Sequence, residues 1–244
     1  MTDTRFVIRA NERAARDVFR LRLEGDASAL KTPGQFVNVA LPGKYLRRPF
    51  SVCDWSDREV ILLYKVVGAG TGLLSRLSAG TELDVLVGLG NGFDAAAGGE
   101  TPVLVGGGLG AAPLPALAKS LLRRGARPVV CLGFATRTDV LLAEELEALG
   151  LEVRVATVDG SAGRRGMVTD LLPASSYVFA CGPEPMLRAV YDCCADGQFS
   201  FENRMGCGFG ACMGCTCETN FGPKRVCRDG PVFRKEEILW QKRL

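Results

Sequence analysis

The chain has 244 residues, of which 47% are hydrophobic and 23% charged, and its 30 basic and 27 acidic residues leave a net charge of +3. The composition argues against a disordered chain, and the length favours two domains with a small appendage. The net charge is too small to create the strong positive potential that would indicate a nucleic-acid partner. The chain contains no histidine, which excludes a Ser-His-Asp triad, a histidine general base and any histidine-ligated metal.

The first half of the chain, from Arg5 to about Gly99, consists of short apolar runs separated by glycine, proline and charged residues. Such runs with turn residues between them predict a small antiparallel barrel or sandwich. The expected strands cover residues 18–23, 35–41, 60–67 and 82–87.

Two motifs in this half suit a bound cofactor. In Arg48-Pro49-Phe50-Ser51 the arginine can neutralise a pyrophosphate, the aromatic ring can lie against a flavin, and the serine hydroxyl can reach a ring nitrogen. The simpler interpretation is a turn with a buried phenylalanine. The glycine-rich run 68–72 precedes an expected helix over 73–77, which suits an anion at a helix N-terminus or a plain turn.

The pattern changes after residues 95–99, where we expect the domain boundary. Strands are expected over 102–105, 128–132, 152–156 and 177–180, and helices over 114–123 and 140–149. This alternation predicts a parallel sheet with crossover helices.

Two loops follow strands of this sheet. The run 106–111 matches G-x-G-x-x-A, yet no acidic residue precedes Asp139 at the end of the second strand, so nucleotide binding is expected outside the ordinary dinucleotide mode. Cys181-Gly182-Pro183 ends another strand and is expected to face the same crevice, with Cys181 a candidate at the nicotinamide site. The alternative for this loop is a buried thiol without function.

Five of the ten cysteines lie between Cys207 and Cys227. The C-x4-C-x2-C run of Cys207, Cys212 and Cys215, followed by Cys227, has the plant-type [2Fe-2S] spacing, with Cys217 as a spare. A four-thiolate zinc site is the alternative, but zinc ribbons usually carry two C-x2-C pairs and this run has one. The remaining cysteines outside the Cys181 loop are interpreted as small hydrophobic residues, namely Cys53, Cys131, Cys193 and Cys194.

Over essentially the whole chain, these segments in this order resemble the ferredoxin–NADP reductase superfamily and, within it, the iron–sulfur electron-transfer subunits of class 1B dihydroorotate dehydrogenase. The most specific stretches are 202–207 and 227–233. The family has a longer gap before its fourth cysteine, and Phe50 stands where its flavin motif usually has tyrosine. The resemblance implies an antiparallel FAD-binding β-barrel over 1–98, a parallel α/β NAD-binding domain over 99–198 and a [2Fe-2S] segment over 199–244.

The resemblance also implies site residues. For FAD these are Arg48, Pro49, Phe50, Ser51, Leu63, Tyr64, Lys65, Gly70 and Thr71. For the nicotinamide nucleotide they are Gly106, Gly108, Gly110, Cys181, Gly182 and Pro183. The implied cluster ligands are Cys207, Cys212, Cys215 and Cys227.

The implied activity is electron transfer from NADH through FAD and the cluster to the FMN of a separate dihydroorotate dehydrogenase catalytic subunit, in a heterotetramer with two of each subunit. NADPH stays open as the donor because Arg137 can meet a 2′-phosphate. The alternatives are a reductase subunit of a glutamate-synthase-like protein, a sulfide dehydrogenase or a ferredoxin transhydrogenase, and a zinc-bearing binding module.

We expect a cytoplasmic protein with no membrane and no nucleic-acid partner. The N-terminus is charged and lacks the apolar region of a signal peptide. The uncharged stretch 101–118 contains glycine and proline, which argue against a membrane-spanning helix.

Overall fold

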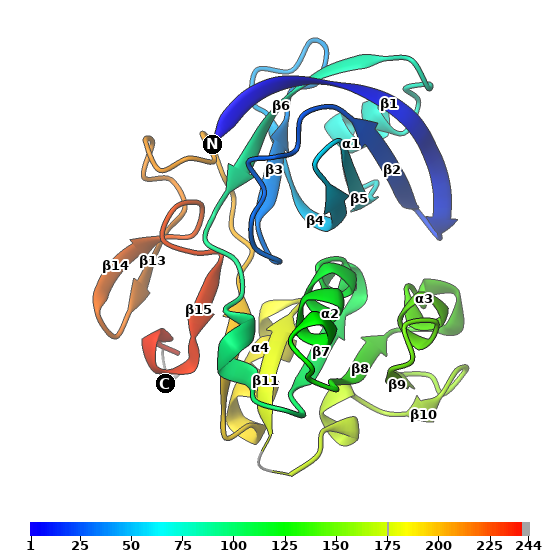
Figure 1. Ribbon diagram of the computed structural model, residues 1–244, viewed down its shortest axis with the longest axis vertical. Helices are drawn as coiled ribbons and strands as arrows, with labels where there is room; N and C mark the ends of the chain where they lie inside the picture. Colours follow the sequence, from blue (N-terminus) through cyan, green and yellow to red (C-terminus); the bar gives the residue numbers. More distant parts are fainter. Residues whose placement is uncertain (175, 241–244) are drawn as a thin grey trace.

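The computed structural model describes residues 1–174 and 176–240. Six strands of the first half close into an antiparallel barrel in the order β1-β2-β5-β4-β3-β6, the upper part of Figure 1. These strands are β1 (Thr2–Ala15), β2 (Val18–Glu24), β3 (Phe36–Val39), β4 (Arg48–Ser56), β5 (Glu59–Lys65) and β6 (Glu82–Leu89). The predicted barrel is confirmed. The long strand β1 was not among the expected strands, because charged residues interrupt its apolar pattern.

Alternation along β3 determines what each side of this strand contacts. Val37 and Val39 belong to the core inside the barrel. Phe36 belongs to a different cluster, together with Cys215 and Cys227 of the C-terminal segment. The outer surface of the barrel at β3 is therefore a packing surface for the cysteine-rich part of the chain.

The second half forms a seven-stranded sheet in the order β10-β9-β8-β7-β11-β12-β15. Its strands are β7 (Val103–Gly107), β8 (Val129–Phe134), β9 (Glu152–Thr157), β10 (Arg164–Arg165), β11 (Tyr177–Cys181), β12 (Asp196–Ser200) and β15 (Val232–Arg234). Neighbouring strands run parallel except for β12 and β15, which run antiparallel. The helices are α2 (Leu114–Arg123), α3 (Ala143–Glu147) and α4 (Glu184–Cys193). The predicted parallel α/β architecture is confirmed.

Several elements differ from the expectation. Helix α1 (Ala69–Leu74) begins four residues earlier than expected, inside the glycine run, and α3 is shorter than the expected 140–149. Helix α4 and strand β12 were missed. Helix α4 has Pro185 in its first turn, where proline is tolerated because the missing amide has no helical partner.

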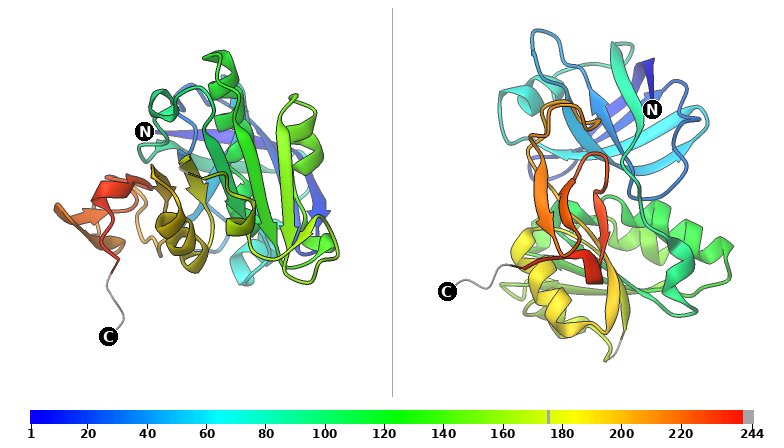
Figure 2. Two further views of the ribbon diagram at one scale, coloured as in Figure 1. Left: turned by 90° about the horizontal axis from the view of Figure 1, so that it is seen from below. Right: turned by 90° about the vertical axis from the view of Figure 1, so that its left-hand side faces the viewer.

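The C-terminal segment is joined to the sheet at both of its ends. It leaves the sheet after β12, forms the hairpin of β13 (Thr216–Thr219) and β14 (Gly222–Arg225), and returns as β15 beside β12. Figure 2 shows the segment lying against both the barrel and the sheet. The expected boundary between residues 198 and 199 falls within β12. Residues 241–244 of the expected cluster segment lie outside the described residues.

Apolar packing and ion pairs join the barrel to the α/β domain. Val18, Cys53 and Leu63 of the barrel share one core with residues of α2. The Arg20 guanidinium donates to both carboxylate oxygens of Glu145 in α3. Since these charged groups are partly exposed, the apolar core supplies most of the stabilisation. In the described part of the chain no helix is both long enough and apolar enough to cross a membrane.

We predict that Phe233→Ala lowers the free energy of unfolding by about 3–5 kcal/mol, because it leaves a cavity where β15 packs on the sheet. Phe233 is 2% exposed, whereas Phe221 in the same segment is 66% exposed. The matched control Phe221→Ala should change stability by no more than about 0.5 kcal/mol. Urea denaturation followed by circular dichroism measures both variants, and equal losses would contradict the assigned packing.

Candidate functional site

A cavity of about 370 Å³ lies where the barrel, the sheet and the C-terminal segment meet. Most of the residues predicted to contact a flavin line it, namely Arg48, Pro49, Phe50, Ser51, Leu63, Tyr64, Lys65 and Thr71. Gly110 and Cys181, predicted for the nicotinamide side, line this cavity too. Its wall combines apolar and aromatic surface with a few polar groups, which is the usual chemistry of a cofactor site.

Gly70 does not line this cavity but supports Arg48. A Cβ atom added at Gly70 would lie 2.6 Å from Arg48 Nε, so the guanidinium lies directly on the glycine. The Arg48 side chain also donates through Nη1 to the Leu46 carbonyl, at 2.6 Å. The arginine and the first turn of α1 are thereby brought together, as the two separate sequence motifs require if they bind one anionic group.

The C-terminal segment contributes cavity residues that the sequence analysis did not assign to a cofactor. They are Ser200, Phe201, Glu202, Asn203, Met205 and Pro231, and they are joined by Phe36 of β3 and Val67 after β5. Glu202 is exposed to solvent by its surface area, yet the protein atoms around its carboxyl raise the pKa of that group. Recognising β12 would have placed Ser200 and Glu202 at the carboxyl end of a strand, where α/β sheets bind ligands.

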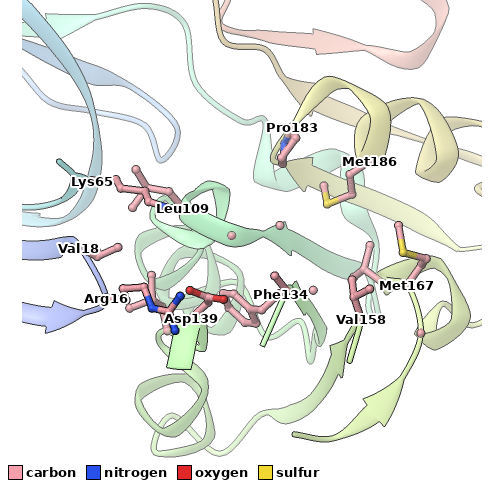
Figure 3. A pocket seen from close by; sticks show the side chains of 17 residues that line it. Arg16, Val18, Lys65, Leu109, Phe134, Asp139, Val158, Met167, Pro183 and Met186 are labelled. Atoms are coloured by element: carbon pink, nitrogen blue, oxygen red, sulfur yellow. The ribbon is translucent and has the colours of Figure 1, made fainter. Parts of the chain in front are cut away.

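A second cavity, of about 330 Å³, opens at the carboxyl ends of β7 and β8 (Figure 3). Lys65, Val18 and Arg16 reach it from the barrel, and Met186 and Met167 approach from the other side. Among the predicted nicotinamide-side residues, Gly108 and Pro183 line it. Gly106 instead faces α2, where an added Cβ would lie 2.8 Å from Leu114 Cδ1, and Gly182 packs on Met186.

The two cavities adjoin, because Lys65 and Leu109 line both. They lie where β7 pairs with β11, the position at which the strand order of the sheet reverses direction. Gly110 in the first loop approaches the Cys181 carbonyl and the Gly182 Cα so closely that no Cβ would fit. The sequence-based expectation that both loops face one crevice is therefore confirmed.

The second cavity has few charged side chains. Asp139 lines it, but its carboxylate accepts hydrogen bonds from the Thr136 amide and hydroxyl at 3.2 and 2.8 Å. Arg137, considered for a 2′-phosphate, does not line the cavity and donates through Nε to the Ser161 carbonyl at 2.7 Å. Arg16 and Lys65 are thus its cationic lining residues among those described.

Cys207 begins a loop whose backbone amides point at sulfur atoms. The amides of Ala211 and Cys212 donate to Cys207 Sγ at 3.3 and 3.4 Å, and that of Gly214 donates to Cys212 Sγ at 3.5 Å. Gly208 has φ +80°, which allows the chain to wrap around the thiols. Burial acts to raise the pKa of Cys207, but these amide hydrogen bonds outweigh it and lower the pKa to about 6.

The four predicted ligands lie in two neighbouring pairs. The Cys212 amide donates to Cys207 Sγ at 3.4 Å in the first pair, and Cys215 and Cys227 form the second. The Cys227 amide donates to Cys215 Sγ at 3.4 Å, and burial, followed by the adjacent Cys215, raises the pKa of Cys227 to about 12. Within residues 1–174 and 176–240, no three side chains of Cys, Asp or Glu gather around a position for a single metal ion.

The other cysteines are distributed differently. Cys217 lies on β13 and is partly buried. Cys53, Cys131 and Cys194 are buried, as their interpretation as small hydrophobic residues requires. The same interpretation is wrong for Cys193, which is exposed at the end of α4.

Comparison with known proteins reveals a family match and close relatives. Residues 202–239 match the iron-sulfur cluster binding domain of dihydroorotate dehydrogenase B. The chain is similar to proteins named dihydroorotate dehydrogenase B (NAD(+)), electron transfer subunit, from Bacillus caldolyticus (42% identity, 96% of this chain and 98% of the relative) and Fusobacterium nucleatum (37% identity, 95% and 96%).

Solved structures agree with this similarity. An NADH-dependent reduced ferredoxin-NADP oxidoreductase, described in connection with flavin-based electron bifurcation, matches with a TM-score of 0.86 at 30% identity, over 96% of this chain and 90% of that chain. Phthalate dioxygenase reductase matches with a TM-score of 0.63 at 21% identity, over 78% and 63%. This second likeness is one of fold alone.

We predict that Cys181 resists alkylation at pH 8 in the folded protein. Burial, followed by the charge of Glu202, raises the pKa of its thiol to about 12, so almost no reactive thiolate is present. The exposed Cys193 is the internal control and should be labelled readily. Peptide mass spectrometry after brief iodoacetamide treatment distinguishes the two, and labelling of Cys181 as fast as Cys193 would contradict the assigned burial.

Proposed function

Because the chain belongs to the family of dihydroorotate dehydrogenase B electron transfer subunits, we propose that it carries electrons from NADH through FAD and a [2Fe-2S] cluster to a catalytic partner subunit. One observation supports this path above the others. The 330 Å³ cavity, proposed for the nucleotide and called the nucleotide-side cavity, adjoins the 370 Å³ cavity, proposed for the flavin and called the flavin-side cavity, and the second of these adjoins the cysteine-rich segment. Lys65 and Leu109 line both cavities, and Asn203 lines the second while donating to the Cys215 carbonyl at 3.4 Å.

The flavin-side cavity has residues suited to each part of FAD. Arg48, lying on Gly70 beside Thr71, supplies the positive charge for a pyrophosphate. Phe50 and Tyr64 supply aromatic surface for a flavin ring. When bound, FAD accepts a pair of electrons as hydride and releases them one at a time, which suits a one-electron cluster.

The nucleotide-side cavity is proposed to take NADH. Its apolar wall includes Leu109, Phe134 and Met186, and Arg16 and Lys65 provide charge for the phosphates. Because Arg137 is held by Ser161 and does not line this cavity, we favour NADH over NADPH as the donor. The apolar lining would also exclude water from the place where hydride is handed over.

Cys207, Cys212, Cys215 and Cys227 are the proposed cluster ligands. The amides that already point at Cys207, Cys212 and Cys215 fit thiolates bound to iron, since hydrogen bonds to the sulfurs stabilise their negative charge. The backbone contacts that pair Cys207 with Cys212 and Cys215 with Cys227 would suit a cluster with two irons, each held by two thiolates.

The partner is proposed to dock on the surface around Cys212. This cysteine is exposed, and Phe209 and Met213 beside it are 44% and 54% exposed. Aromatic and methionine side chains are enriched in protein interfaces, so electrons would leave the cluster at a surface made for contact. We propose an FMN-containing dihydroorotate dehydrogenase catalytic subunit as that partner, in a heterotetramer with two of each subunit, working in the cytoplasm in pyrimidine biosynthesis.

We predict that Arg48→Ala weakens FAD retention by about 1.5–3 kcal/mol, the size of a charge-assisted hydrogen bond to a phosphate. Arg22→Ala is the matched control, because Arg22 forms an exposed ion pair with Glu59 elsewhere on the barrel. Flavin content after gel filtration at low flavin concentration measures the effect. Equal flavin occupancy in both variants would refute the assignment of Arg48.

The ligand assignment tests the proposed function directly. We predict that Cys227→Ser depletes the cluster while Cys217→Ser retains it, since Cys217 lies on β13, outside the two cysteine pairs that amide hydrogen bonds connect. Iron analysis and electron paramagnetic resonance after anaerobic reduction report the cluster, with NADH expected to reduce the wild-type protein faster than NADPH. Zinc without iron in the wild-type protein, or a full signal in the Cys227 variant, would overturn the proposal.

A further inference from the structure

Asn38 connects the barrel to the cysteine loop. It lies on β3 with only 1% of its surface exposed, and its Nδ2 donates to the Cys207 carbonyl at 3.1 Å. The orientation of the amide follows from this contact, because only the NH2 group can donate to a carbonyl oxygen. A strand of the barrel thus holds the backbone of the first predicted cluster ligand.

Packing alone does not explain an asparagine at this position. Its Oδ1 is buried and has no hydrogen-bond partner among the described residues. A buried acceptor without a partner lowers stability, and an apolar side chain of the same size would avoid that loss. The Asn38 amide therefore contributes a hydrogen bond to the Cys207 carbonyl that a leucine at position 38 could not make.

On the cavity side, β3 pairs with the strand that carries the predicted flavin motif. Asn38 lies opposite Pro49, and Phe36 lies opposite Ser51. Phe36, two residues before Asn38 and on the same face of β3, lines the flavin-side cavity. The residue that holds Cys207 is thus part of the same two-stranded unit that forms the cavity wall.

On the loop side, the fit leaves no free space. A Cβ added at Gly208 would lie 2.5 Å from Asn38 Nδ2. The loop can therefore pack against the Asn38 amide only because residue 208 is glycine. This contact fixes the position and the direction of the backbone as it leaves Cys207. The other half of the loop is held by the Asn203 contact with Cys215, whose 3.4 Å distance is longer.

We propose that Asn38 is a positioning residue that fixes the Cys207 end of the cluster loop against the flavin-bearing strand and thereby controls electron transfer from flavin to cluster. The inference rests on the proposed function. Hydride transfer takes place on the nucleotide side, in a cavity that Asn38 does not line. Loss of the contact should therefore slow the second electron-transfer step and leave the first unchanged.

The test compares Asn38→Leu and Asn38→Ser with Asn220→Ala in the purified holoprotein. Asn220 is a matched control, because its Nδ2 also donates to backbone carbonyls of the C-terminal segment, those of Glu236 and Ile238 at 2.9 and 3.2 Å. Stopped-flow absorbance after anaerobic mixing with NADH separates flavin reduction from cluster reduction. Electron paramagnetic resonance reports the surroundings of the cluster.

We expect both Asn38 variants to reduce flavin at the wild-type rate and to reduce the cluster about fivefold more slowly, the population change that one lost hydrogen bond permits. Their resonance line shape should also change, whereas Asn220→Ala should behave as wild type in both respects. Wild-type cluster reduction with an unchanged line shape in the Asn38 variants would overturn the role of Asn38. If the leucine variant does not fold, the serine variant carries the comparison.

Failure of the proposed function would look different. Wild-type protein without flavin or without iron would refute the electron path itself. In that case hydrogen exchange of the amides of residues 208–211 still tests the Asn38 contact. Exchange that is faster in Asn38→Ser than in Asn220→Ala supports the contact, and equal exchange overturns it.

Discussion

The walls of the flavin-side cavity depend on apolar packing against the outer surface of the barrel. Phe36, Leu86 and Leu89 from β3 and β6 share one buried cluster with residues of the sheet and of the C-terminal segment. Burying a phenylalanine of this kind contributes about 1.5–3 kcal/mol. One buried cluster thus includes residues of the barrel, the sheet and the C-terminal segment. This shared packing holds the cavity walls that the three parts contribute in fixed positions relative to one another.

Local sequence patterns determined the parts of the fold that were predicted. Short apolar runs between turn residues predicted the barrel, and alternating strands and helices predicted the parallel sheet. The meeting of the loops at Gly110 and Cys181 was also foreseeable, since both follow strands of one parallel sheet and ligands bind where the strand order reverses. Arg48 was found through its motif and Tyr64 through the family resemblance, and both line the cavity.

The features that were missed depend on contacts between distant residues. Strand β12 carries the polar Gln198 in a buried position, and its side chain is satisfied by the Asp94 backbone and the Tyr177 hydroxyl. No local sequence pattern predicts a strand whose buried polar residue is satisfied by residues far away in the chain. Without β12, Glu202 and Asn203 have no visible relation to a cavity. In the sequence, Asn38 is a single polar residue within an apolar strand. Its role becomes visible only in the folded chain, where it contacts Cys207, 169 positions away.

Strand β15 also protects the sheet from unwanted association. It follows the fourth cysteine and pairs antiparallel with β12 through Val232, Phe233 and Arg234. Without it, β12 would become an open edge with unpaired backbone groups and the buried Phe199, which is the usual starting point for edge-to-edge aggregation. Deleting the cysteine-rich segment to obtain a minimal two-domain reductase would therefore lower its solubility. Keeping residues 231–234 paired with β12 would avoid this loss.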